Sequence, residues 1–308
     1  MRQVKVVALG TAGPIPTPER SSPSFALVRE GEILLFDCGE GAQRQMFKAG
    51  LSPCAKMCIF ISHLHGDHVF GIFGLLHTMN LLNRQHRLQI YGPQGLRDLV
   101  EAVLAHTGLK PRFPLELLEV RGGVVRETES YLVKAAWAEH SVPCLAYAYI
   151  EKDYLGRFHP ERAEALGVPK GPLWKKLQRG EEVVLEDGRV VKPEEVVEPP
   201  IPGIKVVYSG DTKPCNSVVE LAREADLLIH EATFAEDLRD RAEEEKHSTA
   251  KGAAEVALKA GVKKLVLTHV SNRYRDLQLL EGEAREVFKK SYLARDLDVF
   301  LVTREKPK

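Results

Sequence analysis

The sequence lacks long apolar segments, an excess of charge of one sign and paired cysteines. No apolar run approaches the roughly 18 residues of a membrane-spanning helix, and residues 1–7 alternate charged with β-branched residues instead of forming the apolar stretch of a secretory signal. We therefore expect a cytoplasmic protein without a membrane partner. The five scattered cysteines argue against a disulfide framework. Cys54 and Cys58 resemble half of a thiolate metal site, but no second pair completes it.

The charges balance, with 43 Lys and Arg against 43 Asp and Glu. The whole molecule therefore exerts no net field on a polyanion, and any affinity for nucleic acid has to come from a local basic patch. Hydrophobic residues make up 44% of the 308 residues and charged residues 28%, which is typical of a globular protein with a sizeable core. This length suits one large α/β domain with an insertion.

Short runs rich in Val, Ile and Leu alternate with segments of helical periodicity, a pattern typical of an α/β layered fold. The pattern predicts strands at residues 5–9, 24–29, 33–36, 57–62, 88–91, 131–137, 145–150, 204–209, 227–229, 265–267 and 299–302. It predicts helices at residues 41–49, 71–82, 95–106, 217–225, 249–260 and 282–291.

The pattern changes between residues 151 and 200. Charge increases, helical periodicity is lost, and prolines stand at positions 160, 169, 172, 193, 199 and 200. We interpret residues 152–200 as an arm inserted into a single domain that spans residues 1–308.

The densest group of polar donors lies directly after an apolar run. His63, His65, Asp67 and His68 place three imidazoles and a carboxylate within six residues. On an extended exit from a strand, His63 and His65 can turn to one side, while Asp67 and His68 face a second point. Nitrogen and carboxylate donors without thiolates suit a catalytic zinc site better than a structural one. We therefore predict that this loop serves two metals.

One loop cannot complete two coordination shells, so further donors are expected at other strand ends. His140, Asp211 and His269 each follow a predicted strand. The carboxyl ends of strands are where α/β folds place their active sites. Taken alone, each of the three also has an ordinary interpretation as a surface or turn residue. Together with the first group they favour metal ligation.

Residues 63–68 resemble the HxHxDH motif of the metallo-β-lactamase superfamily, and His140, Asp211 and His269 follow in the order and approximate spacing of its later motifs. Within that superfamily the chain resembles the ribonuclease Z family nearly end to end. The supporting segments are LLFDCGEG at 34–41, YGP at 91–93, SGDT at 209–212, HEATF at 230–234, HST at 247–249 and HVSNRY at 269–274. The last three are the more specific to this family.

The resemblance implies a four-layer αββα metallo-β-lactamase sandwich with an inserted flexible arm. It also implies two Zn2+ ions per subunit, although these donors accept Mn2+ or Fe2+ as well. One zinc would be bound by His63, His65 and His140 and the other by Asp67, His68 and His269. Asp211 would bridge the two ions.

The activity implied by the resemblance is removal of the 3′ trailer from precursor tRNA. A hydroxide held by the metals would attack the phosphodiester, leaving a 3′-hydroxyl on the tRNA and a 5′-phosphate on the trailer. The family assigns proton acceptance to the first-motif aspartate, here Asp67. We expect His247 to protonate the departing oxygen and Glu231 to hold its other ring nitrogen, and Arg273 to contact a phosphate. His247 as a residue preceding a helix, and Arg273 in a surface ion pair, are the ordinary alternatives.

Supporting roles fall to residues near these motifs. We expect Asp37 and His230 to brace the site through hydrogen bonds. The remaining histidines lie outside any motif and are expected on the surface or in helix packing; these are His77, His86, His106 and His159.

Residues 170–180, within the arm, contain four cations, one tryptophan and no acid. They resemble the flexible arm with which the ribonuclease Z family grips the tRNA elbow, including its Gly-Pro turn. The expected RNA contacts are Lys170, Gly171, Pro172, Lys175, Lys176 and Arg179. A solvated loop is the alternative, because the flanking arm is rich in acids.

Other implications concern specificity and partners. Loop 16–21 keeps Pro16 and Arg20 of the family's loop that rejects transcripts already bearing CCA, but it lacks the expected lysine and asparagine. The resemblance implies a homodimer in which each arm serves the partner's active site, and no DNA partner is expected. A small-molecule phosphodiesterase, lactonase or thioester hydrolase of the same fold is the main alternative. A non-catalytic RNA-binding subunit would require the absence of one or more ligands, and none is missing.

Overall fold

The computed structural model describes residues 2–154 and 156–304. They form two compact units. The larger consists of Arg2–Ile150 and Ile204–Thr303, and the continuous part of the smaller is Glu151–Gly203. Among the described residues, no helix combines the length and the apolar character needed to span a lipid bilayer.

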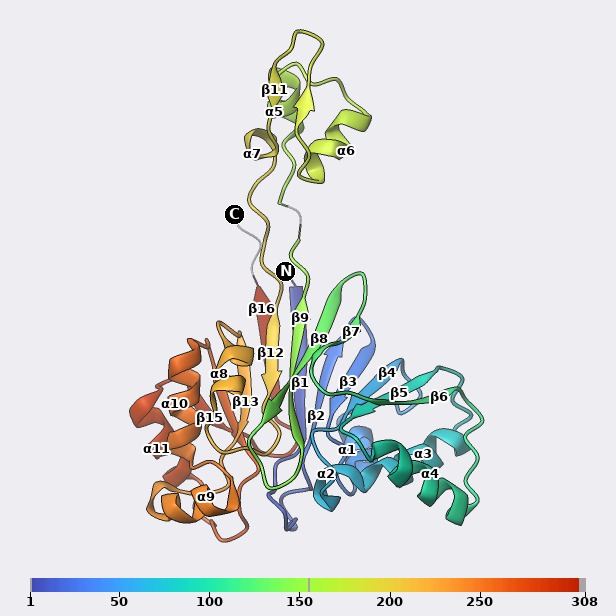
Figure 1. The fold of residues 1–308 in the computed structure, drawn as a ribbon, viewed down its shortest axis with the longest axis vertical. Helices are drawn as coiled ribbons and strands as arrows, with labels where there is room; N and C mark the ends of the chain where they lie inside the picture. Colours follow the sequence, from blue (N-terminus) through green and yellow to red (C-terminus); the bar gives the residue numbers. More distant parts are fainter. Residues whose placement is uncertain (1, 155, 305–308) are drawn as a thin grey trace. The chain divides into compact units, whose positions relative to one another are not determined.

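The larger unit contains two seven-stranded sheets packed face to face (Figure 1). In order across the first sheet, the strands are β16 (Val299–Arg304), β1 (Arg2–Gly10), β2 (Ser24–Arg29), β3 (Glu32–Phe36), β4 (Met57–Phe60), β5 (Leu88–Gly92) and β6 (Leu115–Glu119). In order across the second, they are β15 (Ser291–Leu293), β14 (Leu265–Thr268), β13 (Leu227–Glu231), β12 (Lys205–Tyr208), β9 (Cys144–Glu151), β8 (Tyr131–Ala138) and β7 (Gly123–Glu127).

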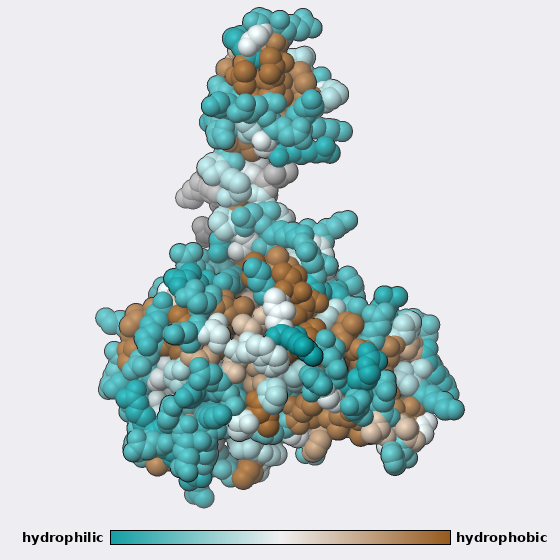
Figure 2. Space-filling model, viewed as in Figure 1, coloured by the Kyte–Doolittle hydropathy of each residue, from teal (hydrophilic) through white to brown (hydrophobic). Residues whose placement is uncertain are grey.

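Helices cover the outer face of each sheet (Figure 1). Against the first sheet lie α1 (Ala42–Lys48), α2 (Gly66–Val69), α3 (Gly71–Leu81) and α4 (Leu96–Thr107). On the side of the second lie α8 (Asn216–Ala222), η1 (Glu236–Leu238), α9 (Arg239–Glu245), α10 (Ala250–Ala260) and α11 (Gln278–Val287). Figure 2 shows mostly hydrophilic residues over this second group, as expected of helices whose apolar sides face a sheet.

The side chains of the central strands explain the layering. In β9, Leu145, Tyr147 and Tyr149 face the apolar cluster between the sheets, while Ala146 and Ala148 face the cluster beneath the helices. Alternate residues of a strand point to opposite faces, so a strand that is apolar on both faces has to be covered on both. The expected four-layer αββα sandwich is confirmed.

Two predictions at the sheet margins were incomplete. The edge strands β6 and β7 were not predicted, because their polar and partly exposed side chains give no apolar pattern. The helix predicted at 282–291 begins earlier, where Asp276 Oδ1 accepts a hydrogen bond from the Gln278 backbone N–H over 2.9 Å. Ser291 does not end that helix; it begins β15 and pairs with Leu265 of β14.

The smaller unit has its own elements, α5 (Pro160–Ala165), α6 (Pro172–Gln178), β10 (Val183–Val184), β11 (Val190–Val191) and α7 (Pro193–Val196). They enclose a small apolar core that includes Ala163, Leu177 and Val196. The sequence pattern predicted no helix in this segment, and its described residues form three short ones. Each helix begins at a proline, which the first turn tolerates because its backbone N–H groups have no partner in the helix. Pro172 therefore starts α6, and the change of direction falls on Gly171, whose φ is 141°.

Of the four histidines expected on the surface or in helix packing, His159 is buried, at the N-terminus of α5. Its Nδ1 lies 2.8 Å from Glu161 Oε1, and its Nε2 lies 3.0 Å from Glu198 Oε1. Its backbone N–H donates to the carbonyl oxygen of Val196 over 2.7 Å. This histidine therefore joins the two chain segments that enter and leave the smaller unit.

Candidate metal centre

Polar residues gather where strands of both sheets end. β3 and β4 are parallel, as are β12, β13 and β14, so the carboxyl ends within each group share one edge of the sheet. The residues that follow these ends, or close them, include Asp37, His63, Asp211, Glu231 and His269.

The first predicted ligand group comes together as expected. One nitrogen each from His63, His65 and His140 lies within 4.8 Å of the other two. His63 Nε2 is 3.0 Å from His65 Nδ1, which is 3.4 Å from His140 Nε2. The other nitrogen of His140, Nδ1, donates to the Lys246 carbonyl oxygen over 3.2 Å, which directs Nε2 toward this group.

The second predicted group is equally compact. Asp67 Oδ2 lies 3.3 Å from His68 Nε2 and 3.5 Å from His269 Nε2. Asp67 is held at the start of the short helix α2, and His269 directly follows β14 with a φ of 57°. All three donor atoms lie within 4.8 Å of one another.

Asp211 lies between the two groups, as predicted. Its Oδ2 is 3.4 Å from His68 Nε2, 3.3 Å from His269 Nε2 and 3.8 Å from His63 Nε2. Gly210 brings this loop close to the first sheet, because a Cβ added there would lie 2.8 Å from the Ser62 side chain. The structure thus brings all seven predicted ligands together around one space.

The chemistry of the site fits divalent cations. Among the described residues, Nε2 of His68 and Nε2 of His269 are buried without a hydrogen-bond partner, which is costly unless something binds them. Burial, reinforced by the neighbouring His68, lowers the pKa of His63 well below its usual value. Burial raises the pKa of Asp211, but His269 and His68 lower it to well below the ordinary range. Burial lowers the pKa of His68, but Asp211 and Asp37 raise it to well above its usual value, so this ring has to lose a proton before it binds a metal. The neutral His63 imidazole and the ionised Asp211 carboxylate are already in the forms that bind metals.

The expected Asp37 brace is present as hydrogen bonds. Asp37 Oδ1 accepts from the Ser62 backbone N–H over 2.7 Å. Its Oδ2 accepts from Ser62 Oγ, His68 Nδ1 and Tyr208 OH at 2.8, 2.6 and 2.7 Å. A carboxylate partner on Nδ1 leaves the Nε2 of His68 directed at the ligand group.

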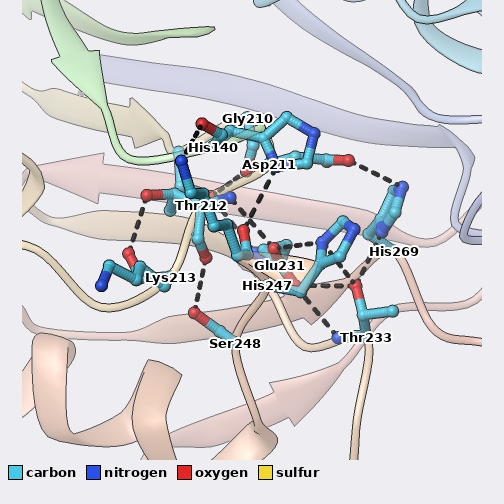
Figure 3. A network of polar contacts seen from close by, with 12 residues as sticks. His140, Gly210, Asp211, Thr212, Lys213, Glu231, Thr233, His247, Ser248 and His269 are labelled. Atoms are coloured by element: carbon cyan, nitrogen blue, oxygen red, sulfur yellow. Dashed lines mark hydrogen bonds and ion pairs between the residues drawn. The ribbon is translucent and has the colours of Figure 1, made fainter. Parts of the chain in front are cut away.

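A second buried carboxylate, Glu231, lies beside the ligands (Figure 3). Its Oε1 accepts from His247 Nδ1 over 2.7 Å and from the Thr212 backbone N–H over 3.0 Å. Burial lowers the pKa of His247, but Glu231 raises it, to about 9. The ring of His247 stacks on that of His269 with centroids 5.5 Å apart. The predicted proton donor and its partner are therefore in contact beside the ligands.

Hydroxyl residues of this region were not predicted. Thr212 Oγ1 accepts from the Glu139 backbone N–H over 3.0 Å, which ties the loop of His140 to that of Asp211. Thr233 Oγ1 lies 2.7 Å from Glu231 Oε2 and 2.9 Å from His269 Nδ1. Both threonines stand inside the SGDT and HEATF segments, and membership of those segments was the only signal for them in the sequence.

His230 is buried beside this carboxylate, where Nδ1 donates to the Glu231 carbonyl oxygen over 2.8 Å. It therefore contacts the backbone of the site and not a predicted ligand. Cys54 and Cys58 belong to no potential metal-binding group in the described part of the chain.

Arg273 is exposed, and its guanidinium carbon lies 4.8 Å from the centroid of the Phe234 ring. Its Nε donates to Ser271 Oγ over 3.0 Å, and within the described ranges it forms no ion pair with a carboxylate, so the alternative of a surface ion pair is not observed. The Phe234 ring is 6.1 Å from the ring of His247. Arg273 thus packs on Phe234, and Phe234 in turn lies beside His247, the predicted proton donor.

The four cations predicted to bind RNA are exposed on the smaller unit; they are Lys170, Lys175, Lys176 and Arg179. Trp174 is directed inward, since its Nε1 donates to the Val168 carbonyl oxygen over 3.0 Å and its ring packs on Phe158. Its indole therefore anchors α6, and the cations are left as the available RNA contacts.

Comparison with known proteins gives one consistent likeness. A family model described as a β-lactamase superfamily domain matches residues 196–270, and one described as anti-Pycsar protein Apyc1 matches residues 4–112. The chain is 46% identical to ribonuclease Z of Methanosarcina acetivorans over 96% of each chain. It is 48% identical to ribonuclease Z of Methanothermobacter thermautotrophicus over 96% of this chain and 95% of that one. The crystal structure of human tRNase Z, short form, matches with a TM-score of 0.71 and 29% identity, covering 99% of this chain and 100% of that one.

Proposed function

The chain belongs to the ribonuclease Z family of tRNA 3′-processing endoribonucleases, and from this premise we propose that it removes the 3′ trailer from precursor tRNA with two zinc ions bound by the seven ligands. The observation that carries the chemistry is the pair of donor groups that share Asp211.

In this proposal His63, His65 and His140 would hold one ion, Asp67, His68 and His269 would hold the other, and Asp211 would contribute to both. Two divalent ions at such a site lower the pKa of a shared water and neutralise charge on the phosphate under attack. The same donors also accept manganese or iron, so the ion found in purified protein identifies the metal.

The chain's own side chains handle the protons. Asp67 is proposed to accept the proton of the attacking water, and 14% of its side chain is exposed against 4% for Asp211. His247 is proposed to protonate the departing 3′ oxygen, while Glu231 fixes its orientation through the 2.7 Å contact with Nδ1. The products are a 3′-hydroxyl on the tRNA and a 5′-phosphate on the trailer.

Substrate binding is proposed to use two cationic regions. Arg273 would contact a phosphate near the cleaved bond, because it has no carboxylate partner in the described residues and its guanidinium stays exposed. Residues 152–200 would act as a tRNA-binding arm inserted in a single domain, with the exposed cations of residues 170–179 on the RNA backbone and Gly171-Pro172 setting the start of α6.

The experiment compares a 3′-extended precursor tRNA with bis(4-nitrophenyl) phosphate and maps both ends of the RNA products. We expect cleavage at the 3′ end of the tRNA body, with the two product termini stated above. Hydrolysis of the small diester, a lactone or a thioester without any cleavage of the precursor would reject the tRNA assignment in favour of a small-molecule hydrolase.

Assembly and location are proposed from family membership. We propose a cytoplasmic homodimer in which each arm serves the partner's active site. A mixture of two variants tests this arrangement, one with a substituted arm and one that lacks a metal ligand. After subunit exchange, cleavage of the precursor is restored only if the intact arm of one subunit serves the intact active site of its partner.

A further inference from the structure

The hydroxyl of Thr233 lies between a buried carboxylate and a predicted metal ligand (Figure 3). Its Oγ1 is 2.7 Å from Glu231 Oε2 and 2.9 Å from His269 Nδ1. The Thr233 backbone N–H also donates to Glu231 Oε2, over 3.1 Å. Thr233 and Glu231 are both nearly fully buried, so little solvent competes for these contacts.

Proton accounting gives each contact a direction. A threonine hydroxyl has one proton, and an ionised carboxylate can only accept. The hydroxyl therefore donates to Glu231, and its oxygen accepts a hydrogen bond from the N–H at Nδ1 of His269. In a neutral imidazole this leaves the lone pair on Nε2, the atom that faces Asp67 and Asp211 and has no hydrogen-bond partner in the described residues.

We propose that Thr233 is a positioning residue whose hydroxyl fixes the tautomer and orientation of His269 for the second metal and links this ligand to the carboxylate that holds His247. Glu231 then contacts the proton donor through Oε1 and the metal ligand through Oε2 and Thr233. The inference rests on the proposed metal centre and adds to it a dependence of metal affinity on one hydroxyl.

The other end of the site has the same arrangement. Ser62 Oγ donates to Asp37 Oδ2 over 2.8 Å and lies 2.9 Å from His63 Nδ1. The same Asp37 oxygen contacts His68 directly. One buried carboxylate and one hydroxyl thus support a histidine in each half of the ligand set, which supports a positioning role for the hydroxyl of Thr233.

The test replaces the hydroxyl and measures metal binding. Thr233→Val keeps the shape and removes the hydroxyl, while Thr233→Ser keeps the hydroxyl and removes the methyl group. Because hydrogen-bond partners of metal-bound histidines typically contribute about 10- to 100-fold to metal affinity, we expect Thr233→Val to bind the zinc of the His269 group less tightly by about that factor. Zinc titration against a competing chelator and zinc content after dialysis provide the readouts. Thr233→Ser should match the unmodified protein.

Thr268→Val is the matched control. Thr268 precedes His269 and is equally buried, but its Oγ1 has no hydrogen-bond partner in the described residues. We expect this variant to keep its full zinc content. If Thr233→Val does not fold, Thr233→Ala tests the same hydroxyl without the added methyl group.

Normal zinc affinity in the folded valine or alanine variant would overturn the proposal. Equal decreases in Thr233→Ser and Thr233→Val would overturn it as well, because the hydroxyl would then not be the cause. Metal binding is measured without RNA, so failure of the proposed tRNA cleavage would appear separately, as unmodified protein that holds zinc but leaves the precursor intact.

Discussion

The carboxylate of Asp37 accepts a hydrogen bond from Nδ1 of His68 over 2.6 Å, and both side chains are fully buried. Ser62 and Tyr208 donate to the same carboxylate. Asp37 follows β3 of the first sheet and Tyr208 ends β12 of the second, so this carboxylate joins the two sheets beside residues 62–68. Its contribution is therefore both to stability and to ligand orientation.

Asp37→Asn should lower the free energy of unfolding by about 3 kcal/mol or more, because a neutral amide cannot accept from all the donors that now surround the carboxylate. Urea unfolding of chelator-treated protein measures this decrease without a contribution from bound metal. Tyr208→Phe removes a single donor and should cost about 1.5–3 kcal/mol. Equal stability of the two variants would show that the carboxylate is not the organising group.

His247→Ala should reduce cleavage of precursor tRNA by roughly 100- to 10,000-fold in kcat, the usual contribution of a general acid. Hydrolysis of bis(4-nitrophenyl) phosphate should fall far less, because 4-nitrophenolate leaves without being protonated. Single-turnover rates on both substrates, with zinc content measured in parallel, check this prediction. Equal decreases on the two substrates would point to a role in metal binding or folding.

Glu231→Gln should reduce precursor cleavage and weaken zinc binding together. The amide lacks the charge that raises the pKa of His247, and its single oxygen cannot accept from both His247 and Thr233. Zinc content and the rates on both substrates are the measurements. Full zinc binding with a selective loss of precursor cleavage would show that the contact between Glu231 and Thr233 does not position His269.

The seven predicted ligands could be selected from the sequence because each donor follows an apolar strand, and strand ends define where an α/β site forms. His63 and Asp211 illustrate this, since both stand just beyond strands whose apolar residues are easily recognised. The convergence of these residues could be predicted from the layer order of the fold alone, without details of side-chain packing.

The roles of Thr233 and Ser62 could not be predicted from the sequence in the same way. A hydroxyl acquires its role from the two groups on either side of it, and His269 lies 36 positions away from Thr233 in the chain. The φ of 57° at His269 is likewise invisible in the sequence, because non-glycine residues adopt this conformation only where their surroundings require it. The prolines at 160, 172 and 193 were not recognised as helix starts, because the position of a proline within a helix decides its effect.

Removing the metals should destabilise the protein, and each of the two ions should account for part of the lost stability. Any ion that binds only the native state adds stability, by about 4 kcal/mol when present at 1,000 times its dissociation constant. Chelation should therefore lower Tm, and zinc should restore it. His140→Ala removes a ligand of the first group only, so one zinc should remain and Tm should be partly restored. Complete restoration in Asp211→Ala would contradict the shared position of this carboxylate.

Replacing Lys175, Lys176 and Arg179 by alanine should weaken precursor binding through electrostatics alone. Removing each cation that binds a phosphate should reduce the slope of log affinity against log salt by about 1, so the variant should show both a higher KM at low salt and a flatter salt dependence. Hydrolysis of bis(4-nitrophenyl) phosphate should be unchanged, because this small diester needs no extended backbone contact.

A matched control separates the position of these cations from the removal of charge itself. Lys110, Lys259 and Lys289 are exposed on the larger unit, and replacing all three by alanine removes the same net charge. If RNA binds through the arm, only the first triple variant should show weaker affinity and a flatter salt dependence. If both variants show these changes equally, the overall charge drives binding, and the segment 170–179 is an ordinary solvated surface.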